Sequence, residues 1–372
     1  MDYSTDNQPV LAELTSEAKR QLLQLEQALR KHWRLGQNMV LCWAPDPRGL
    51  LTLTVPHYFL GNFTAQDGNS SNEIFIREVI SGSRLKSHED IFSIAKRLQV
   101  STAFIKLDDP FGADEALLQA ADSIVARYGI GYVESRAVLL FDIAEFSLYS
   151  PFEQASQLNS LSYSMNSAFN KLQREGVEVN FARTTTGDGY YVWNRDVGSY
   201  PDLDLLVFLF LVLVDNAAAR REASGHTVPV IRAAFHIGSH YELFQAEGVN
   251  PTVFSYIVGD VTIKLARLLE NAEAGQVLVG DFHVPLPEEE GLHDANAFLR
   301  RAVAELGELN KLPISGKPLS NWSLERASCG GEQCVAIEIT DKHGLKQQAF
   351  NVVFSVLVGT QELSVGIPTN TQ

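Results

Sequence analysis

The sequence is poor in cysteine and in basic residues. Only three cysteines occur in 372 residues, Cys42, Cys329 and Cys334, and they are too few and too scattered for a disulfide framework or a spaced zinc site. Lys and Arg number 30 against 45 Asp and Glu, and the formal net charge is -15. We therefore expect no nucleic-acid partner and no membrane partner, because binding to either depends on an excess of cations.

Long apolar runs are also missing, and no leader sequence is expected. The first 20 residues contain acids and no basic-then-apolar pattern, so no signal peptide is predicted. The strongest apolar run, residues 205–214, is much shorter than the roughly 20 residues that a bilayer requires. It is expected to be a buried core helix or strand. With so few cysteines, a reducing cytoplasm is the simplest location.

The remaining composition, with 45% hydrophobic and 20% charged residues, is that of a globular protein with a real core. We predict three modules, at 1–130, 131–285 and 286–372. In the middle module, strands alternate with helices over about 150–174, 205–221 and 260–271, which predicts an α/β sandwich, an α+β arrangement of sheet and helices. A turn at 129–131 is expected to mark its start.

The N-terminal module reads as a small α+β unit of unknown role. Apolar residues recur at helical spacing over 14–34, with Thr15 or Ser16 placed to cap the helix. This helix either packs on its own domain or supports a dimer. A loop is expected over 64–72 and a helix over 88–98. Sensing, partner binding and dimer support all remain open for this module.

Two aspartates stand at predicted strand ends in the middle module. Asp142 closes the run AVLLFDI, and Asp188 lies in the tight turn TTTGDGYY. Taken singly, each also fits an N-cap or a turn, but together they suit Mg²⁺ or Mn²⁺, which prefer carboxylate, water and phosphate oxygens. The backbone of Ala144, Glu145 and Phe146 leads from the strand toward a helix, where N–H groups often bind phosphate.

Four motifs follow one another over about residues 135–280. They are LLFDIAEFS, TTTGDGYYVW, RAAFHIG and VGDVTIKLARLLENAEAGQVLVG. In this order they resemble the catalytic domain of the class III nucleotidyl cyclases, the adenylate and guanylate cyclases. The motifs resemble the first-metal strand, the second-metal hairpin, the central strand, and the transition-state helix with the final strand of that family.

The resemblance implies a reaction and a set of residue roles. Asp142, Ile143 and Asp188 would form a site for two Mg²⁺ or Mn²⁺ ions, and Arg267 would stabilise the charge that develops on the α-phosphate. In this family the ribose 3′-hydroxyl of a nucleoside triphosphate attacks that phosphorus, which releases pyrophosphate and closes a 3′,5′-cyclic nucleotide. The family also implies a head-to-tail homodimer with shared active sites.

Two departures from the family concern the substrate base. Thr184 and Tyr256 stand where adenylate cyclases usually carry a Lys and an Asp or Thr, and leaving a buried base edge unpaired costs about 1–3 kcal/mol. A bulky tyrosine opposite a small hydroxyl residue narrows the pocket toward a one-ring base. This pattern resembles the pyrimidine cyclases of bacterial antiphage defence, which make cyclic UMP or cyclic CMP. The segment DKHGLKQQAFN resembles the C-terminal sensor-like module beside some of them.

A third departure concerns turnover. Ile263 stands where the family carries the asparagine that orients the ribose. Two alternatives to a pyrimidine cyclase therefore stay open. One is an adenylate cyclase with atypical base recognition, and the other is a non-catalytic pseudocyclase that binds a nucleotide without turning it over.

Overall fold

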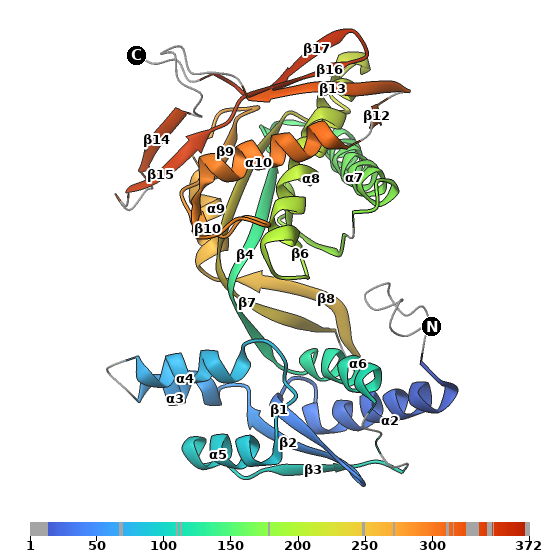
Figure 1. Ribbon diagram of the computed structural model, residues 1–372, viewed down its shortest axis with the longest axis vertical. Coiled ribbons are helices and arrows are strands. Elements are labelled where there is room, and N and C mark those ends of the chain that lie inside the picture. The colour runs from blue at the N-terminus through green and yellow to red at the C-terminus, as the bar shows by residue number, and fades with distance from the viewer. Residues whose placement is uncertain are drawn as a thin grey trace. The chain divides into compact units, whose positions relative to one another are not determined.

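The structure is a computed structural model, and it describes residues 14–66, 70–108, 111, 114–177, 179–247, 250–270, 272–309, 312–314, 316–324, 335–340, 344 and 346–368, without the side chains of 245–254 and 335. Cys329 and Cys334 lie outside the described residues, as does part of the segment DKHGLKQQAFN. The chain divides into two compact units, Met1–Glu134 with His240–Val258, and Ser135–Ser239 with Gly259–Gln372. The mixed α/β class that the sequence predicts is confirmed (Figure 1).

The N-terminal unit is built on a small antiparallel sheet in the order β1-β2-β3. One face of the sheet shares a core with α2 and α6, and the other shares a core with α3, α4 and α5. The elements are α2 (Ser16–Trp33), β1 (Asn38–Asp46), β2 (Gly49–Pro56), α3 (Phe59–Ala65), α4 (Ser71–Ile80), α5 (His88–Leu98), β3 (Ala103–Lys106), α6 (Glu115–Ala126) and β8 (Asn250–Val258).

Local capping explains where several of these helices begin. The Thr15 hydroxyl accepts the Ala18 N–H at 3.1 Å and starts α2, as predicted. A capping box formed by Ser87 and Asp90 starts α5 at the predicted residue. The predicted loop over 64–72 is wrong in part, because α3 continues to Ala65 and α4 begins at Ser71. The polar composition of this stretch did not indicate that a helix extends into each of its ends.

The C-terminal unit is built on a larger sheet in the order β14-β15-β9-β7-β4-β6-β5, with β8 paired to β7. Strand β4 begins at Ile130, so the predicted turn at 129–131 is wrong there. The elements up to the predicted boundary at 286 are β4 (Ile130–Ile143), the 3₁₀ helix η1 (Phe146–Leu148), α7 (Pro151–Arg174), β5 (Phe181–Thr185), β6 (Gly189–Asn194), α8 (Ser199–Glu222), β7 (Ile231–Glu247), α9 (Asp260–Glu270), β9 (Val277–Gly280) and β10 (His283–Val284).

The two faces of the central strands are covered by different helices. On β4, Leu139 and Phe141 belong to the core shared with α7 and α8. Their neighbours Leu140 and Asp142 therefore point to the opposite face. Helix α9 packs on that opposite face, because the Tyr191 hydroxyl of β6 donates to the carbonyl of Thr262 at 3.2 Å. Asp142 thus lies on the face that carries α9.

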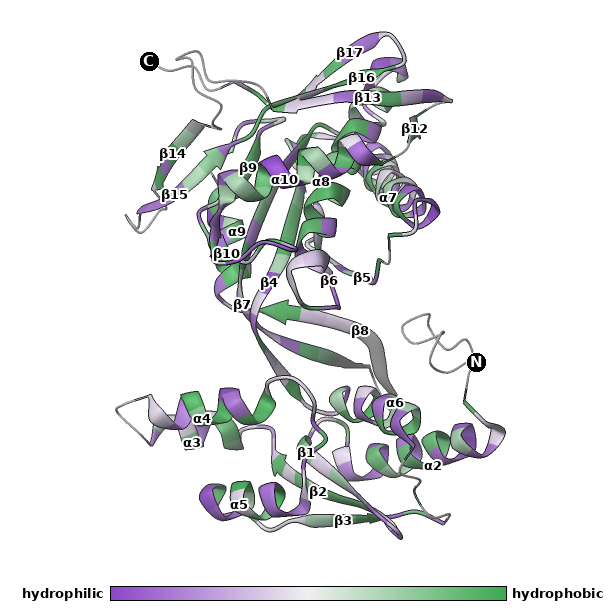
Figure 2. Cartoon of the chain, viewed as in Figure 1, coloured by the Kyte–Doolittle hydropathy of each residue, from purple (hydrophilic) through white to green (hydrophobic). Residues whose placement is uncertain are grey.

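Helix α8 is apolar on every side over its central turns. Residues 205–214 are all buried, and Figure 2 shows α8 as a largely hydrophobic helix. Such a helix needs partners all round it, and α7, the main sheet and the C-terminal elements supply them. The prediction of a buried core segment is confirmed. Among the described helices, none combines the length and apolarity needed to cross a membrane.

Residues beyond 286 share their core with α8. Strand β15 pairs with β9 in the main sheet, and β12-β13-β16-β17 form a second sheet. The boundary of the predicted module at 286–372 therefore does not coincide with a border between the compact units, and its sensor-like role stays a prediction. The elements are β11 (His293–Asp294), α10 (Ala295–Glu308), β12 (Pro313–Ile314), β13 (Lys317–Leu324), β14 (Val335–Thr340), β15 (Lys346–Asn351), β16 (Phe354–Val358) and β17 (Gln361–Val365).

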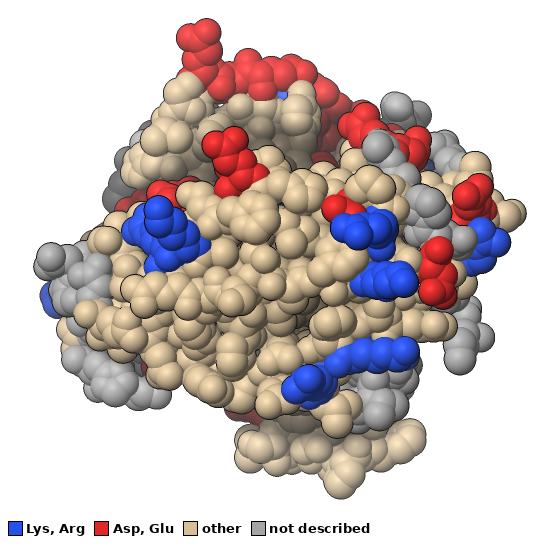
Figure 3. All heavy atoms as spheres, turned by 90° about the horizontal axis from the view of Figure 1, so that it is seen from below, with Lys and Arg blue, Asp and Glu red and all other residues tan. Residues whose placement is uncertain are grey.

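Charged side chains are dispersed on the surface seen in Figure 3. On that face, Lys and Arg form several separate groups, with Asp and Glu near some of them and uncharged residues between them. Asp and Glu also form a longer run along the upper edge of this view.

Candidate functional site

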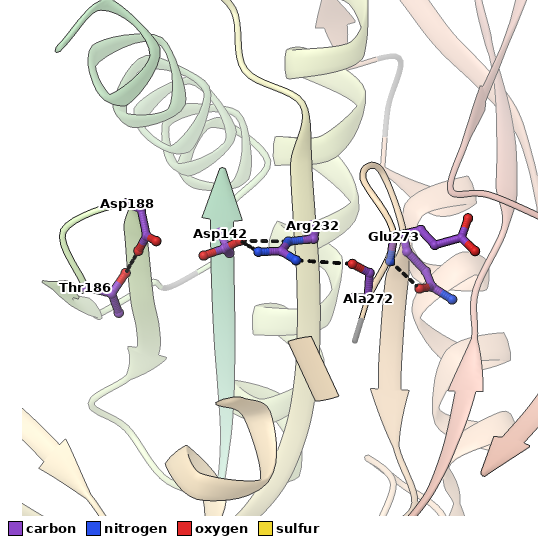
Figure 4. A network of polar contacts seen from close by, with 7 residues as sticks. Asp142, Thr186, Asp188, Arg232, Ala272 and Glu273 are labelled. Carbon is purple, nitrogen blue, oxygen red and sulfur yellow. Dashed lines mark hydrogen bonds and ion pairs between the residues drawn. The ribbon is translucent and has the colours of Figure 1, made fainter. Parts of the chain in front are cut away.

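The structure brings the two predicted metal aspartates to the same edge of the main sheet. Asp142 of β4 pairs with Gly189 of β6, and Asp188 lies in the turn directly before Gly189 (Figure 4). The Ile143 N–H donates to the carbonyl of Asp188 at 3.0 Å, so the turn is fixed to β4. The Thr186 hydroxyl donates to Oδ1 of Asp188 at 3.2 Å.

Glycine is required at position 189 for this arrangement. A Cβ built on Gly189 would lie 1.9 Å from the carbonyl oxygen of Phe141, which is far inside van der Waals contact. The strands could pair with a side chain there only if the backbone moved. The Asp-Gly dipeptide, which also suits any tight turn, is thus needed here for the close approach of β6 to β4.

The surroundings of Asp142 disfavour the ionised form of its carboxyl group. Burial raises its pKa above the ordinary value, Arg232 opposes this rise, and the neighbouring Asp188 adds to it. The Asp142 side chain is 15% exposed. A bound cation would stabilise the ionised form of a partly buried carboxylate such as Asp142.

Sequence reasoning missed Arg232, which contacts Asp142 directly (Figure 4). Its Nε donates to Oδ2 of Asp142 at 2.8 Å, and its Nη2 forms a second contact with the same oxygen. Its Nη1 donates to the carbonyl of Ala272 at 3.2 Å. The only signal in the sequence was the first residue of RAAFHIG, whose alternation places Arg232 opposite the core face of β7.

The donor set fits a hard divalent cation that keeps water and substrate ligands. Among the described residues, no group of three or more His, Cys, Asp or Glu side chains gathers as a ready-made metal site. Two carboxylates with the remaining ligands from water and phosphates are typical of Mg²⁺. The Ile143 side chain is buried and its N–H is already used, so Ile143 has only its carbonyl to offer a metal. The predicted pair of ions stays a prediction.

The predicted phosphate loop is partly occupied by the chain itself. The Ala144 N–H donates to the carbonyl of Val230 at 2.9 Å, so this amide is not available to a phosphate. Glu145 has a left-handed backbone with φ of 58°, and Phe146 begins η1. Of the three amides, those of Glu145 and Phe146 have no acceptor among the described backbone bonds. The predicted phosphate loop therefore depends on the amides of Glu145 and Phe146.

Of the two predicted base-reading residues, one shares the face of Asp142. Thr184 on β5 stands opposite Tyr191 on β6, and Tyr191 points to the face that carries α9. Tyr256 lies on β8 opposite Leu243, within the N-terminal unit, and is 38% exposed. The C-terminal unit therefore brings Thr184, but not Tyr256, to the sheet face of the aspartates.

Arg267 lies in the last turn of α9. The apolar side of α9 is formed by buried residues such as Leu265 and Leu268. Ile263, four residues before Arg267, lies on the same side of the helix as Arg267 and is 49% exposed. Positions 263 and 267 thus share one helix face, and their proposed roles stay predictions.

No family model matches this chain, and no curated protein matches it. Solved structures with partial likeness include the adenylyl cyclase CyaB from P. aeruginosa, at 13% identity, with 60% of this chain and 95% of that chain covered and a TM-score of 0.36. Another is the guanylate cyclase domain of RhGC from Catenaria anguillulae, at 15% identity, 59% and 97% coverage and a TM-score of 0.35. Scores this low do not establish a shared fold, so the proposals below rest on the residues of the chain.

Proposed function

We propose that the chain is a nucleotidyl cyclase, which converts a nucleoside triphosphate into a 3′,5′-cyclic nucleotide and pyrophosphate. The observation that carries this proposal is the pair of carboxylates on adjacent strands. Asp142 and Asp188 are held together by strand pairing and by the bond from the Ile143 amide, and the candidate phosphate loop follows Asp142 directly. One metal ligand and the phosphate donors therefore come from one short stretch of chain, and the β5–β6 turn adds the second ligand.

Each group has a distinct task in this proposal. Asp142 and Asp188 hold Mg²⁺ or Mn²⁺, two per active site, and bound metal supplies activation of the ribose 3′-oxygen and neutralisation of phosphate charge. The amides of Glu145 and Phe146 orient the triphosphate. Arg267 stabilises the charge on the α-phosphate, at about 10²–10³-fold in rate for one such donor. In a head-to-tail homodimer this arginine comes from the second subunit.

The proposed substrate is a pyrimidine nucleotide, UTP or CTP, and the proposed role of the product is signalling in antiphage defence. Thr184 supports this choice, because a short hydroxyl side chain stands on the aspartate face where an adenylate cyclase would carry a cation. Both the substrate and the biological role depend on the resemblance of the motifs. The proposed partners are the nucleotide and a second copy of the chain.

One observation favours a non-catalytic nucleotide-binding protein instead. Arg232 contacts Oδ2 of Asp142 with two of its nitrogens, so a cation already occupies one side of the candidate metal ligand. Ile263 in place of the family's asparagine points in the same direction. In this second proposal the chain would bind a nucleotide and report its presence without cyclising it.

Product formation separates these functions. Purified chain is incubated separately with ATP, GTP, CTP and UTP in the presence of Mn²⁺, and cyclic nucleotide and pyrophosphate are quantified. We expect cyclic UMP or cyclic CMP, lost in Asp142→Ala and kept in the matched surface variant Asp196→Ala. Product from ATP alone would overturn the pyrimidine assignment. Binding without product from any of the four would favour the non-catalytic function.

Mixing two inactive variants tests the shared active site. Asp142→Ala lacks a metal ligand and Arg267→Ala lacks the charge donor, so each homodimer is expected to be inactive. A mixed dimer would contain one site with both groups intact, and activity should reappear on mixing. Continued inactivity of the mixture, or full activity of Arg267→Ala alone, contradicts the proposed sharing.

A further inference from the structure

A chain of hydrogen bonds leads away from the candidate metal site on the far side of Arg232. The Nη1 of Arg232 donates to the carbonyl of Ala272 at 3.2 Å. The same peptide group donates its N–H, which belongs to Glu273, to Oε1 of Gln276 at 2.9 Å (Figure 4). Both ends of one peptide group are therefore used, one by Arg232 and the other by Gln276.

The chain continues through two buried amide side chains. Nε2 of Gln276 donates to Oδ1 of Asn351 at 2.9 Å, and Nδ2 of Asn351 donates to the carbonyl of Ile367 at 2.8 Å. Gln276 is 9% exposed and Asn351 is 3% exposed. The polar relay thus joins Asp142 to strand β15 and to the segment that follows β17.

All donors in the relay point the same way. Gln276 must present its oxygen to the Glu273 N–H and its nitrogen to Asn351, and Asn351 must in turn present its nitrogen to the Ile367 carbonyl, so backbone partners fix both amide orientations. Hydrogen bonds aligned head to tail polarise one another in a buried setting. A fully satisfied relay of this kind holds its members in one arrangement.

We infer that Gln276 and Asn351 are positioning residues for Asp142, through which strand β15 controls metal binding at the candidate site. The inference rests on the proposed function, since it assigns the Asp142 site to a metal. Neither amide touches Asp142. Their effect passes through Arg232, whose contact with the Ala272 carbonyl limits it to one oxygen of the carboxylate.

The chemistry of arginine explains why this limit matters. A guanidinium group can engage both oxygens of a carboxylate at once, and this bidentate geometry is its strongest pairing. Held by Ala272, Arg232 places Nε and Nη2 on Oδ2 alone. Oδ1 is thereby left for a metal. If the peptide group were free to move, Arg232 would compete with the metal for both oxygens.

The backbone around the relay has its own anchors. The Ala233 N–H donates to the Gln276 carbonyl at 3.0 Å, and the Val352 N–H donates to the Val277 carbonyl at 2.9 Å. Gly275, with φ of +90°, provides the left-handed turn that directly precedes Gln276. Removing the Asn351 side chain should therefore loosen the relay while β9 and β15 stay paired.

The test is Mn²⁺ binding to the full chain, followed by electron paramagnetic resonance without nucleotide. Asn351→Ala is expected to weaken binding about 3- to 10-fold, the range that corresponds to loss of one hydrogen bond. In an Arg232→Gln background the same change should have no effect, because no guanidinium is left to compete. Asn194→Ala is the matched control, since Asn194 is also buried and its Oδ1 accepts one backbone N–H.

The outcomes separate this inference from the proposed function. Equal weakening by Asn351→Ala in both backgrounds, or binding equal to that of the unchanged chain, overturns the inference, as does Mn²⁺ binding insensitive to Asp142→Ala. If Asn351→Ala weakens Mn²⁺ binding only when Arg232 is present, and no cyclic product forms, the inference is upheld and the cyclase is overturned. If Asn351→Ala fails to fold, Gln276→Met, which is close in volume and breaks both of its side-chain bonds, replaces it with the same expected results.

Discussion

Replacement of Phe354 by alanine tests whether residues beyond 286 are part of the core that supports the candidate site. Phe354 on β16 is fully buried. Its ring centroid lies 4.5 Å from that of Phe210 on α8 and 6.2 Å from that of Trp322 on β13. Because α8 also packs on the main sheet, a cavity at Phe354 is expected to weaken the whole C-terminal unit.

The expected loss of stability follows from this environment. Phe→Ala in a well-packed core costs about 3–5 kcal/mol, and a lost aromatic pair adds about 0.5–1.5 kcal/mol. A loss near 5 kcal/mol would lower the unfolding temperature by about 10–20 °C for a unit of this size. The exposed Phe152, at 78% exposure on α7, is the matched control, and its replacement should change the unfolding temperature little.

Thermal unfolding and hydrogen exchange of α8 together provide the assay. We expect Phe354→Ala to lower the unfolding temperature and to reduce amide protection in α8 by the same free energy, because both measure one cooperative core. If residues 286–372 formed an independent module, the variant would shift a separate transition and leave α8 protection unchanged. That result would refute the reasoning and support the predicted boundary at 286.

Further predictions concern buried charges and close backbone contacts. Burial raises the pKa of Asp202 to about 7, so the folded state binds more protons than the unfolded state and loses stability from about pH 4 to about pH 7; urea titrations of Asp202→Asn should show this loss removed. Lys171→Met removes the cation that pairs with the buried Asp215 and leaves it only the Ser167 hydroxyl; urea unfolding should show a loss of about 3–5 kcal/mol, largely recovered by adding Asp215→Leu. Gly189→Ala, with its Cβ 1.9 Å from the Phe141 carbonyl oxygen, should lower both thermal stability and Mn²⁺ affinity.

Local chemistry made much of the fold predictable. The cap at Thr15 fixed the start of α2, and the apolar run at 205–214 identified a buried segment. The aspartate pair could also be predicted, because Asp142 closes an apolar strand and Asp188 lies in a tight turn. Each of these predictions depends on neighbouring residues alone, which is the information that propensity and periodicity contain.

Strand order and register lay beyond the sequence. Arg232 and Asp142 are 90 residues apart, and only the adjacency of β7 and β4 shows that they form an ion pair. The insertion of β15 beside β9 likewise depends on a long-range pairing. The availability of the Ala144 amide could not be judged either, because its acceptor belongs to Val230.

The charge balance at Asp142 bears on the proposed metal site. Arg232 supplies one positive charge, whereas Asp142 and Asp188 together supply two negative charges when ionised. The pKa of Asp142 stays raised in spite of Arg232, because burial and the neighbouring Asp188 outweigh the arginine. An arginine that had replaced the metals would be expected to satisfy the site, and this one leaves it short of positive charge. The balance of charge is therefore that of a site which a cation would stabilise, as the proposed binding of a metal–nucleotide complex needs.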